Sequence, residues 1–171
     1  MNRLNQGMLL GVLLLLLLSG ACSKEGNIYD DELQLSQLPG PAQEMLVRIN
    51  EVRTGGCRCG DQDLSAVPPL KWNEQLARAA RRHASDMAAH ALYSHTGSDG
   101  STIGMRAKEA GYSWALIGEN IAHGLSSPQQ VLRAWIDSPS HCKTLMAPEF
   151  TETGLGTQEG YWVQTLGLPG K

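Results

Sequence analysis

The chain has 171 residues, of which 42% are apolar and 18% charged, enough for one hydrophobic core and too few for two domains of ordinary size. Fourteen Lys and Arg residues against 17 acidic residues give a net charge of -3. No basic cluster is present that could neutralise a row of phosphates. The composition therefore argues against nucleic-acid binding, against intrinsic disorder and against a polytopic membrane protein.

The N-terminus has the pattern of a bacterial export signal. Arg3 precedes an apolar run at residues 8–18, which is shorter than the roughly 20 residues that a membrane-spanning helix needs. Leu18–Cys22 resembles the lipobox, although Ser19 stands where an aliphatic residue is commoner. We therefore predict a lipoprotein signal peptide over residues 1–21 and lipidation of Cys22. The alternative is ordinary signal-peptidase cleavage that leaves Cys22 as a free thiol.

Residues 22–40 are expected to form a polar tether to a domain over residues 41–171. The tether contains an acidic patch at residues 30–32 and ends at a Pro-Gly-Pro break. Leu33, Leu35 and Leu38 are apolar enough to pack on the domain, so part of the tether could be docked.

Apolar spacing predicts the first two helices of the domain. One helix covers about 42–53, with Pro41 at its start, and a Gly/Cys-rich loop follows. Asn73 is a plausible N-cap for a longer helix that ends near His90. Its expected inner face consists of Leu76, Ala80, His83, Ala84, Met87 and Ala91, with Arg78, Arg81, Arg82, Ser85 and Asp86 on the other side. We interpret His83 as a buried histidine with one hydrogen-bonding partner rather than as a ligand.

Short helices and strands alternate in the second half of the chain. A helix near 101–110 ends at Gly111, and residues 116–123 are predicted to form a strand that carries Glu119. Ser127, followed by proline and glutamine, begins a helix that ends near Asp137. Residues 151–157 and 161–166 are expected to form a hairpin. The order of these elements predicts an α+β fold, arranged in α-β-α layers.

Polar landmarks spread over residues 42–168 resemble those of the CAP superfamily, which includes cysteine-rich secretory proteins, insect venom antigens and plant pathogenesis-related proteins. In chain order they are Ile49–Arg53, Pro69–Asn73, Ser94–Thr96, Asp99-Gly100, Arg106, Gly111-Tyr112, Gly118–Ala122, Trp135, Ser138–His141 and Gly154–Gly156. Their spacing is most similar to the compact bacterial, SCP-like branch. The resemblance implies an α-β-α sandwich with a central antiparallel sheet and a cleft lined by two histidines and acidic groups.

The resemblance also assigns the residues of the cleft. His95, Glu119 and His141 match two histidines and a glutamate of the family's motifs. Where the family has a further acidic residue three positions after a tryptophan, this chain has Ser138, which argues against chemistry that requires two carboxylates. Ser138 precedes Pro139 and is expected to cap a short helix with its hydroxyl oxygen. That role argues against a Ser-His-acid hydrolase.

Two neutral imidazoles that face one cavity suit Zn²⁺ or another divalent metal ion, and the resemblance makes His95 and His141 the candidate ligands. Glu119 is the candidate catalytic residue, either as a third ligand or as the general base for a bound water. The alternative is a hydrogen-bonded network in which the same three side chains only fix the loops around the cleft.

Three cysteines remain in a domain that is expected to be exported, and exported domains commonly form disulfides. Cys59, followed by glycine, and Cys142, next to His141, resemble a pair found in some bacterial CAP domains. The resemblance implies a Cys59–Cys142 disulfide and leaves Cys57 over, while a Cys57–Cys59 ring would strain the bond. A zinc site made by the three cysteines and His141 is the alternative.

The predicted function is that of a binding module anchored to the cell envelope by lipid on Cys22. Its cleft would hold a small apolar molecule, a lipid, a peptide or a divalent metal ion. The alternative is a metal-dependent hydrolase that uses the same cleft. Ser23 and Lys24 lack the aspartate that tends to retain lipoproteins at the inner membrane of diderm bacteria, which favours the outer membrane in such a cell.

Overall fold

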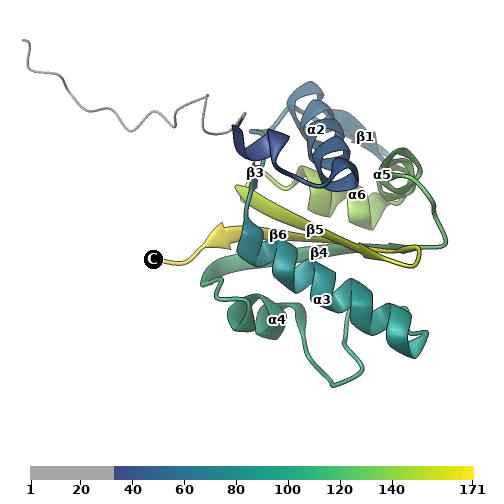
Figure 1. Cartoon of the computed structure of the whole chain (residues 1–171). Coiled ribbons are helices and arrows are strands. Elements are labelled where there is room, and N and C mark those ends of the chain that lie inside the picture. Colours follow the sequence, from purple (N-terminus) through teal and green to yellow (C-terminus); the bar gives the residue numbers. More distant parts are fainter. Residues whose placement is uncertain (1–32) are drawn as a thin grey trace, which may run out of the picture.

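A computed structural model describes residues 33–171 of the chain (Figure 1). The predicted signal peptide, the lipidation site Cys22 and most of the tether lie outside the described residues. Among the helices of residues 33–171, none is both long and apolar enough to cross a membrane.

The described elements follow one another with short connections. In chain order they are α2 (Gly40–Gly55), β1 (Cys57–Cys59), β2 (Gln62–Leu64), β3 (Lys71–Trp72), α3 (Glu74–His90), α4 (Ile103–Glu109), β4 (Trp114–His123), α5 (Pro128–Asp137), α6 (Pro139–Met146), β5 (Glu152–Gln158) and β6 (Tyr161–Pro169). The helices predicted from apolar spacing are all present, with ends that shift by a few residues. The Gly/Cys-rich segment, expected to be a loop, instead forms the β1–β2 hairpin.

The elements stack in three layers, which confirms the α-β-α arrangement (Figure 1). The central sheet has the strand order β3-β5-β6-β4. The β5–β6 and β6–β4 pairs are antiparallel, whereas the short strand β3 runs parallel to β5. Helices α2, α5 and α6 lie on one face of the sheet, and α3 and α4 on the other (Figure 1). The strand β4 is left at an open edge, and the candidate functional residues gather along it.

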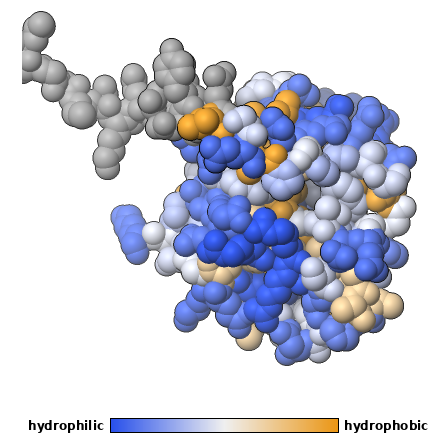
Figure 2. All heavy atoms as spheres, viewed as in Figure 1, coloured by the Kyte–Doolittle hydropathy of each residue, from blue (hydrophilic) through white to orange (hydrophobic). Residues whose placement is uncertain are grey.

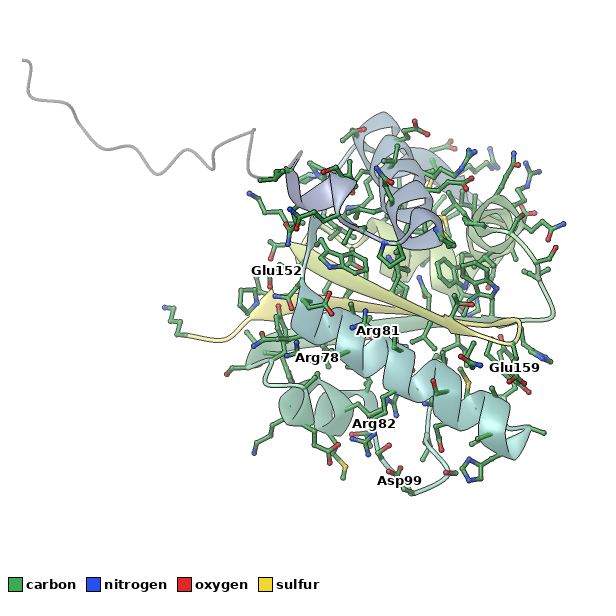
Figure 3. All side chains as sticks on the ribbon, viewed as in Figure 1. Arg78, Arg81, Arg82, Asp99, Glu152 and Glu159 are labelled. Carbon is green, nitrogen blue, oxygen red and sulfur yellow. A yellow bond between two sulfur atoms is a disulfide. The ribbon has the colours of Figure 1, made fainter. Side chains whose placement is uncertain are left out.

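Helix α3 has both the start and the buried face that its sequence predicts. The Asn73 side chain accepts hydrogen bonds from the backbone of Gln75 at 2.9 Å and Leu76 at 3.1 Å, which satisfies two free N–H groups of the first turn. Figure 3 shows the arginines Arg78, Arg81 and Arg82 on the outer surface of the helix. Ala91, predicted to lie on the inner face, is exposed because it is the C-cap, in the left-handed conformation with φ 49°.

Helix α3 packs unusually close to β5, and two glycines of that strand make this contact geometrically allowed. A Cβ atom on Gly154 would lie 2.0 Å from the backbone nitrogen of Ala77, and one on Gly156 would lie 2.3 Å from that of Arg81. Any side chain at these positions would push the helix off the sheet. The Gly-Leu-Gly landmark therefore allows α3 to pack closely on β5.

Arg53, at the C-terminal end of α2, is a buried cross-link between distant segments. Its side chain is completely inaccessible to solvent. Nε donates to the carbonyl of Pro68 at 2.9 Å, and the two terminal nitrogens donate to the carbonyls of Leu145, Ala147 and Phe150. One guanidinium thus satisfies four backbone acceptors, of which one lies in the last turn of α6 and three lie outside the helices and strands.

The end of the predicted tether is docked on the domain. Residues 33–36 are helical, and Leu35 and Leu38 pack against the core cluster that also contains Met45 and Trp72. These contacts remove apolar leucine surface from water, which stabilises the docked arrangement.

Candidate functional site

Glu119 is the centre of the candidate site. It lies on the edge strand β4, and its side chain is only 3% exposed. One carboxylate oxygen accepts a hydrogen bond from Arg106 Nη2 at 2.8 Å, and the other accepts one from His95 Nδ1 at 2.9 Å. Both oxygens of the predicted catalytic residue are therefore engaged by other side chains of the protein.

Arg106 connects α4, the loop after α3 and β4. Its side chain is 2% exposed, as deeply buried as that of Glu119. Besides Glu119, it donates to the backbone carbonyls of Ser101 at 2.8 Å and His95 at 3.1 Å. A buried carboxylate is stable when a charged partner and additional hydrogen bonds compensate for lost hydration. Arg106 is that partner for Glu119, and it also fixes the backbone of His95.

His95 is the exposed part of this network. Its side chain is 57% exposed, and the hydrogen bond to the Glu119 carboxylate raises the pKa of its imidazole. A carboxylate only accepts hydrogen bonds, so Nδ1 of His95 must carry the proton. In the neutral ring Nε2 then keeps a free lone pair, the arrangement typical of a metal-binding histidine with a carboxylate behind it.

His83 lies near the same carboxylate but is not exposed. It is fully buried on the inner face of α3, and Nε2 donates to the backbone carbonyl of Ser94 at 2.8 Å. Its Nε2 is 3.9 Å from Glu119, yet burial dominates and lowers its pKa. The interpretation of His83 as a buried histidine with one backbone partner agrees with this geometry.

His141 reaches the site from the other face of the sheet. Successive residues of a strand point to opposite faces, so Glu119 faces α3 and α4 whereas Asn120 faces α6. Asn120 donates to the backbone carbonyl of His141 at 3.3 Å and to Gln164 at 3.0 Å, which docks α6 on β4. The pKa of His141 is lowered by burial and by the positive charge of His95.

Ser138 has the position that its sequence predicts but not the predicted hydrogen bond. It is the N-cap residue of α6, and its side chain caps no backbone N–H group. Its hydroxyl lies 3.3 Å from the Ser140 hydroxyl instead, a competing partner two residues away. The cap prediction was wrong for this reason. The hydroxyl forms no hydrogen bond with His141 or Glu119, so the described residues do not form a Ser-His-acid triad.

The candidate site offers few free donor atoms for a metal ion. His95 offers Nε2, and the ring nitrogens of His141 have no hydrogen-bond partner within residues 33–171. Glu119 would have to give up Arg106 or His95 in order to bind metal directly. Within the described part of the chain, the compact group of metal-ligating atoms is a set of three cysteines, not these residues.

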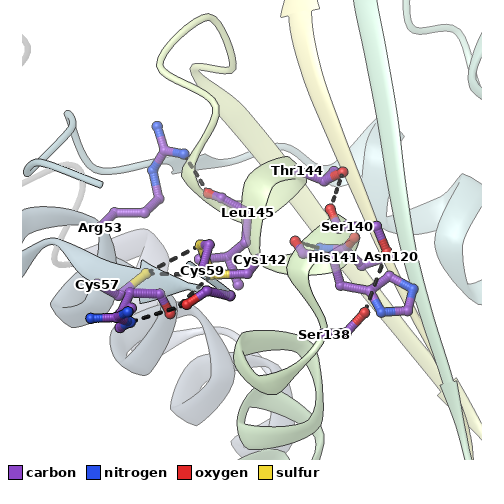
Figure 4. The surroundings of a disulfide bond; sticks show 12 residues. Arg53, Cys57, Cys59, Asn120, Ser138, Ser140, His141, Cys142, Thr144 and Leu145 are labelled. Carbon is purple, nitrogen blue, oxygen red and sulfur yellow. Dashed lines mark hydrogen bonds between the residues drawn. A yellow bond between two sulfur atoms is a disulfide. The ribbon is translucent and has the colours of Figure 1, made fainter. Parts of the chain in front are cut away.

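The three cysteines lie between the β1–β2 hairpin and α6 (Figure 4). Cys59 and Cys142 form a disulfide across a sequence separation of 83, and Cys57 is free, as the resemblance implied. The imidazole of His141 points away from the sulfur atoms in Figure 4. The alternative zinc site, which needed His141 as a fourth ligand, is therefore not assembled.

A concave feature lies between α2, α3 and β5, and nothing in the sequence pattern indicated it. This apolar groove has a volume of about 210 Å³ and is lined by Pro41, Ala42, Met45, Trp72, Leu155 and Trp162. Figure 2 shows apolar side chains in the hollow between the two helices. Arg81, which forms an ion pair with Glu74, lies at its margin.

Sequence reasoning also gave no role to the two buried arginines. Arg53 and Arg106 were recognised only as landmarks, because a long cationic side chain on a helix is normally exposed. The available signal for Arg53 was its position four residues after Ile49, which places it on the buried face of α2.

This three-layered fold, with two histidines and an arginine-held glutamate at one sheet edge, defines the class of the protein. Residues 46–165 match the CAP family, described as the cysteine-rich secretory protein family. The chain belongs to this family. It is similar to an uncharacterised protein, YkwD, of Bacillus subtilis, with 33% identity over 65% of this chain and 43% of the relative.

Solved structures share the fold. An extracellular protein with an SCP domain from Bacillus anthracis superposes with a TM-score of 0.67 and 28% identity, over 75% of this chain and 40% of that one. An outer surface protein from Borrelia burgdorferi superposes with a TM-score of 0.63 and 22% identity, over 75% of this chain and 92% of that one. The chain spans less than half of the length of the curated relatives that it matches.

Proposed function

We propose that the protein is an exported CAP-type binding module rather than a hydrolase. The observation that carries this proposal is the state of Glu119, whose two oxygens are held by Arg106 and His95. A general base must have a water molecule within reach, and the Glu119 side chain is only 3% exposed. Export is supported by the relatives, one named as extracellular and one as an outer surface protein.

The proposed ligand of the cleft is a divalent metal ion such as Zn²⁺, bound by His95 and His141. Glu119 would act through His95, because its carboxylate fixes the tautomer and the orientation of the ring. Two protein ligands leave further coordination positions for water or for a small ligand with a carboxylate or imidazole group. The domain would then present a metal-bridged ligand at the edge of β4.

The apolar groove between α2 and α3 supports a second kind of ligand for the same binding module. Its volume and its two tryptophans suit a short acyl chain or another small apolar molecule, since burial of apolar surface drives such binding. Native mass spectrometry of the purified protein would detect a copurified lipid, and elemental analysis of the same sample would detect a metal.

Calorimetric titration with Zn²⁺ tests the metal proposal. We expect His95→Ala and His141→Ala each to weaken binding at least about tenfold, and Glu119→Gln to weaken it about 10- to 100-fold by disordering His95. Affinity should be lower at about pH 5.5 than at about pH 7.5, because a protonated imidazole has no lone pair to donate. His95 has a raised pKa, so it is protonated first on acidification.

The matched control is His90→Ala, which removes an exposed histidine at the far end of α3. Its affinity for Zn²⁺ should equal that of the wild type. The metal proposal is wrong if the wild type binds Zn²⁺ no more tightly than a variant that lacks both His95 and His141.

A further inference from the structure

The free thiol of Cys57 lies in contact with both sulfur atoms of the disulfide. Its sulfur is 3.5 Å from that of Cys142 and 3.7 Å from that of Cys59 (Figure 4). The hairpin explains this arrangement, because residues two apart on a strand point to the same side. Cys57 and Cys59 therefore both face α6, which contributes Cys142.

The three sulfur atoms differ in their access to solvent. Cys59 is 1% exposed and Cys142 is completely buried, whereas Cys57 is only half-buried. A thiol in solution cannot attack a disulfide whose two sulfur atoms it cannot approach. The only sulfur of this cluster open to an external reagent is that of Cys57.

We propose that Cys57 is the nucleophile of a thiol–disulfide exchange site, through which small thiols, dithiols and disulfides reach the buried Cys59–Cys142 bond. The Cys57 thiol loses its proton to water, and the thiolate attacks the sulfur of Cys142. A Cys57–Cys142 bond forms, the Cys59–Cys142 bond breaks, and its electron pair leaves on Cys59, which takes up a proton. No oxidant or reductant is consumed in this step.

Cys142 is the expected target rather than Cys59. The new Cys57–Cys142 bond would join the same hairpin to the same helix, so the cross-link between the layers would survive. Attack on Cys59 would instead close a ring between two cysteines that are separated by one residue, a geometry that strains a disulfide. The shorter contact, 3.5 Å, is also the one to Cys142.

An external dithiol completes the reduction after the exchange. Its first thiolate attacks Cys57, which the exchange has made one end of the disulfide, and releases Cys142 as a thiol. The second thiol of the dithiol then attacks the first sulfur of the same dithiol, which is bonded to Cys57 in the mixed disulfide. This attack frees Cys57 and leaves the dithiol as a cyclic disulfide. Two electrons have passed from the dithiol to the protein. A small disulfide would run the same sequence in reverse and oxidise the pair.

The resting structure keeps the exchange slow. The nearly equal distances place the Cys57 sulfur beside the disulfide bond rather than on its extension, so the hairpin must shift before an in-line attack. Burial also raises the pKa of the Cys57 thiol and keeps it protonated. The β1–β2 hairpin has strands of three residues each, so a local shift would break few hydrogen bonds.

The first test is the rate at which dithiothreitol reduces the disulfide under native conditions, followed by alkylation of Cys59 and Cys142 and mass spectrometry. We expect Cys57→Ser to be reduced at least about tenfold more slowly than the wild type, because it lacks the internal nucleophile. The control is Leu64→Ala, which removes the cross-strand neighbour of Cys57 and loosens the hairpin without removing a thiol. It should show no slower reduction than the wild type.

The second test asks whether Cys57 can reach Cys142. In Cys59→Ser, treatment with oxidised glutathione should produce a Cys57–Cys142 disulfide, detected by non-reducing peptide mapping. Equal reduction rates in the wild type and Cys57→Ser would overturn the proposal, as would a folded Cys59→Ser protein that keeps both thiols free. If Cys59→Ser does not fold, the reduction rates alone decide, because Cys57→Ser retains the native disulfide.

Discussion

Single polar side chains of α2 fix the positions of segments that are distant in the sequence. Asn50 pairs with Leu70 as a strand neighbour would, because its amide donates to the Leu70 carbonyl at 2.9 Å and accepts from the Leu70 nitrogen at 2.8 Å. Arg53, one turn further along α2, holds four carbonyls. These two residues belong to the first family landmark, which therefore has a structural role.

We predict that Arg53→Lys lowers the free energy of unfolding by about 2–4 kcal/mol, because an ammonium group cannot reach the four acceptors at once and leaves buried carbonyls unsatisfied. Arg48→Lys is the control on the same helix: Arg48 is exposed and paired with Glu44, so its replacement should change stability by less than about 0.5 kcal/mol. Urea denaturation of both variants measures the difference. Similar losses for the two would contradict the role assigned to Arg53.

The hydrogen bonds of single side chains could be predicted where the hydrogen-bonding partner lies within three residues in the sequence. The caps at Asn73 and Ser127 have this property, and each accepts the backbone hydrogen bonds of its own first turn. Ser138 did not follow the rule because Ser140 competes for its hydroxyl. Arg106 and Glu119 are 13 residues apart, so their pairing depends on tertiary packing that no local pattern encodes.

At the scale of elements, helix α3 and strand β5 make a close contact between two layers. It depends on Gly154 and Gly156, whose missing side chains let the helix backbone rest on the strand. A long helix with a strong apolar stripe is predictable from its sequence. The distance at which it packs is not, because that distance is determined by the partner strand.

Gly154→Ala tests this packing. The new Cβ would meet the backbone of Ala77 at 2.0 Å, and backbone cannot rotate aside as a side chain can, so we expect a loss of about 2–4 kcal/mol in the free energy of unfolding. Gly55→Ala is the control, since nothing lies within 4 Å of its added Cβ and alanine favours a helix. It should be neutral or slightly stabilising. Chemical denaturation measures the free energies of unfolding of the two variants, which can be compared directly when their m-values are equal.

The β1–β2 hairpin and the strand β3 escaped sequence analysis for a common reason. Strands of two or three residues are too short to show an alternating pattern, and both lie in segments rich in glycine or proline. Contacts with other elements stabilise these strands. Strand β3 pairs with β5, and the disulfide joins the hairpin to α6.

At the scale of the whole molecule, the fold brings together residues that the sequence separates widely. His95 and His141 lie in a loop and in a helix on opposite sides of the sheet, and both reach the edge strand β4. Sequence spacing alone gave no reason to pair them, so the proposal that they share one site rests on the family resemblance. The strand itself, by contrast, was predictable, because Ile121 and its neighbours have the apolar pattern of a buried strand.

The attachment of the whole protein to a membrane is the remaining prediction, and it rests on Cys22, which lies outside the described residues. Acyl chains on Cys22 would each contribute about 0.8 kcal/mol per buried methylene, and two or more chains make such anchoring stable.

Cys22→Ala should therefore abolish metabolic labelling with a radioactive fatty acid and move the protein from the membrane fraction to the soluble fraction. Cys57→Ser is the matched control, because it removes another cysteine while leaving the lipobox intact, and both its labelling and its fractionation should equal those of the wild type. Immunoblots of separated fractions and autoradiography measure the two effects. A Cys22→Ala protein that stays in the membrane fraction without label would show that another part of the chain, or a bound partner, provides the attachment.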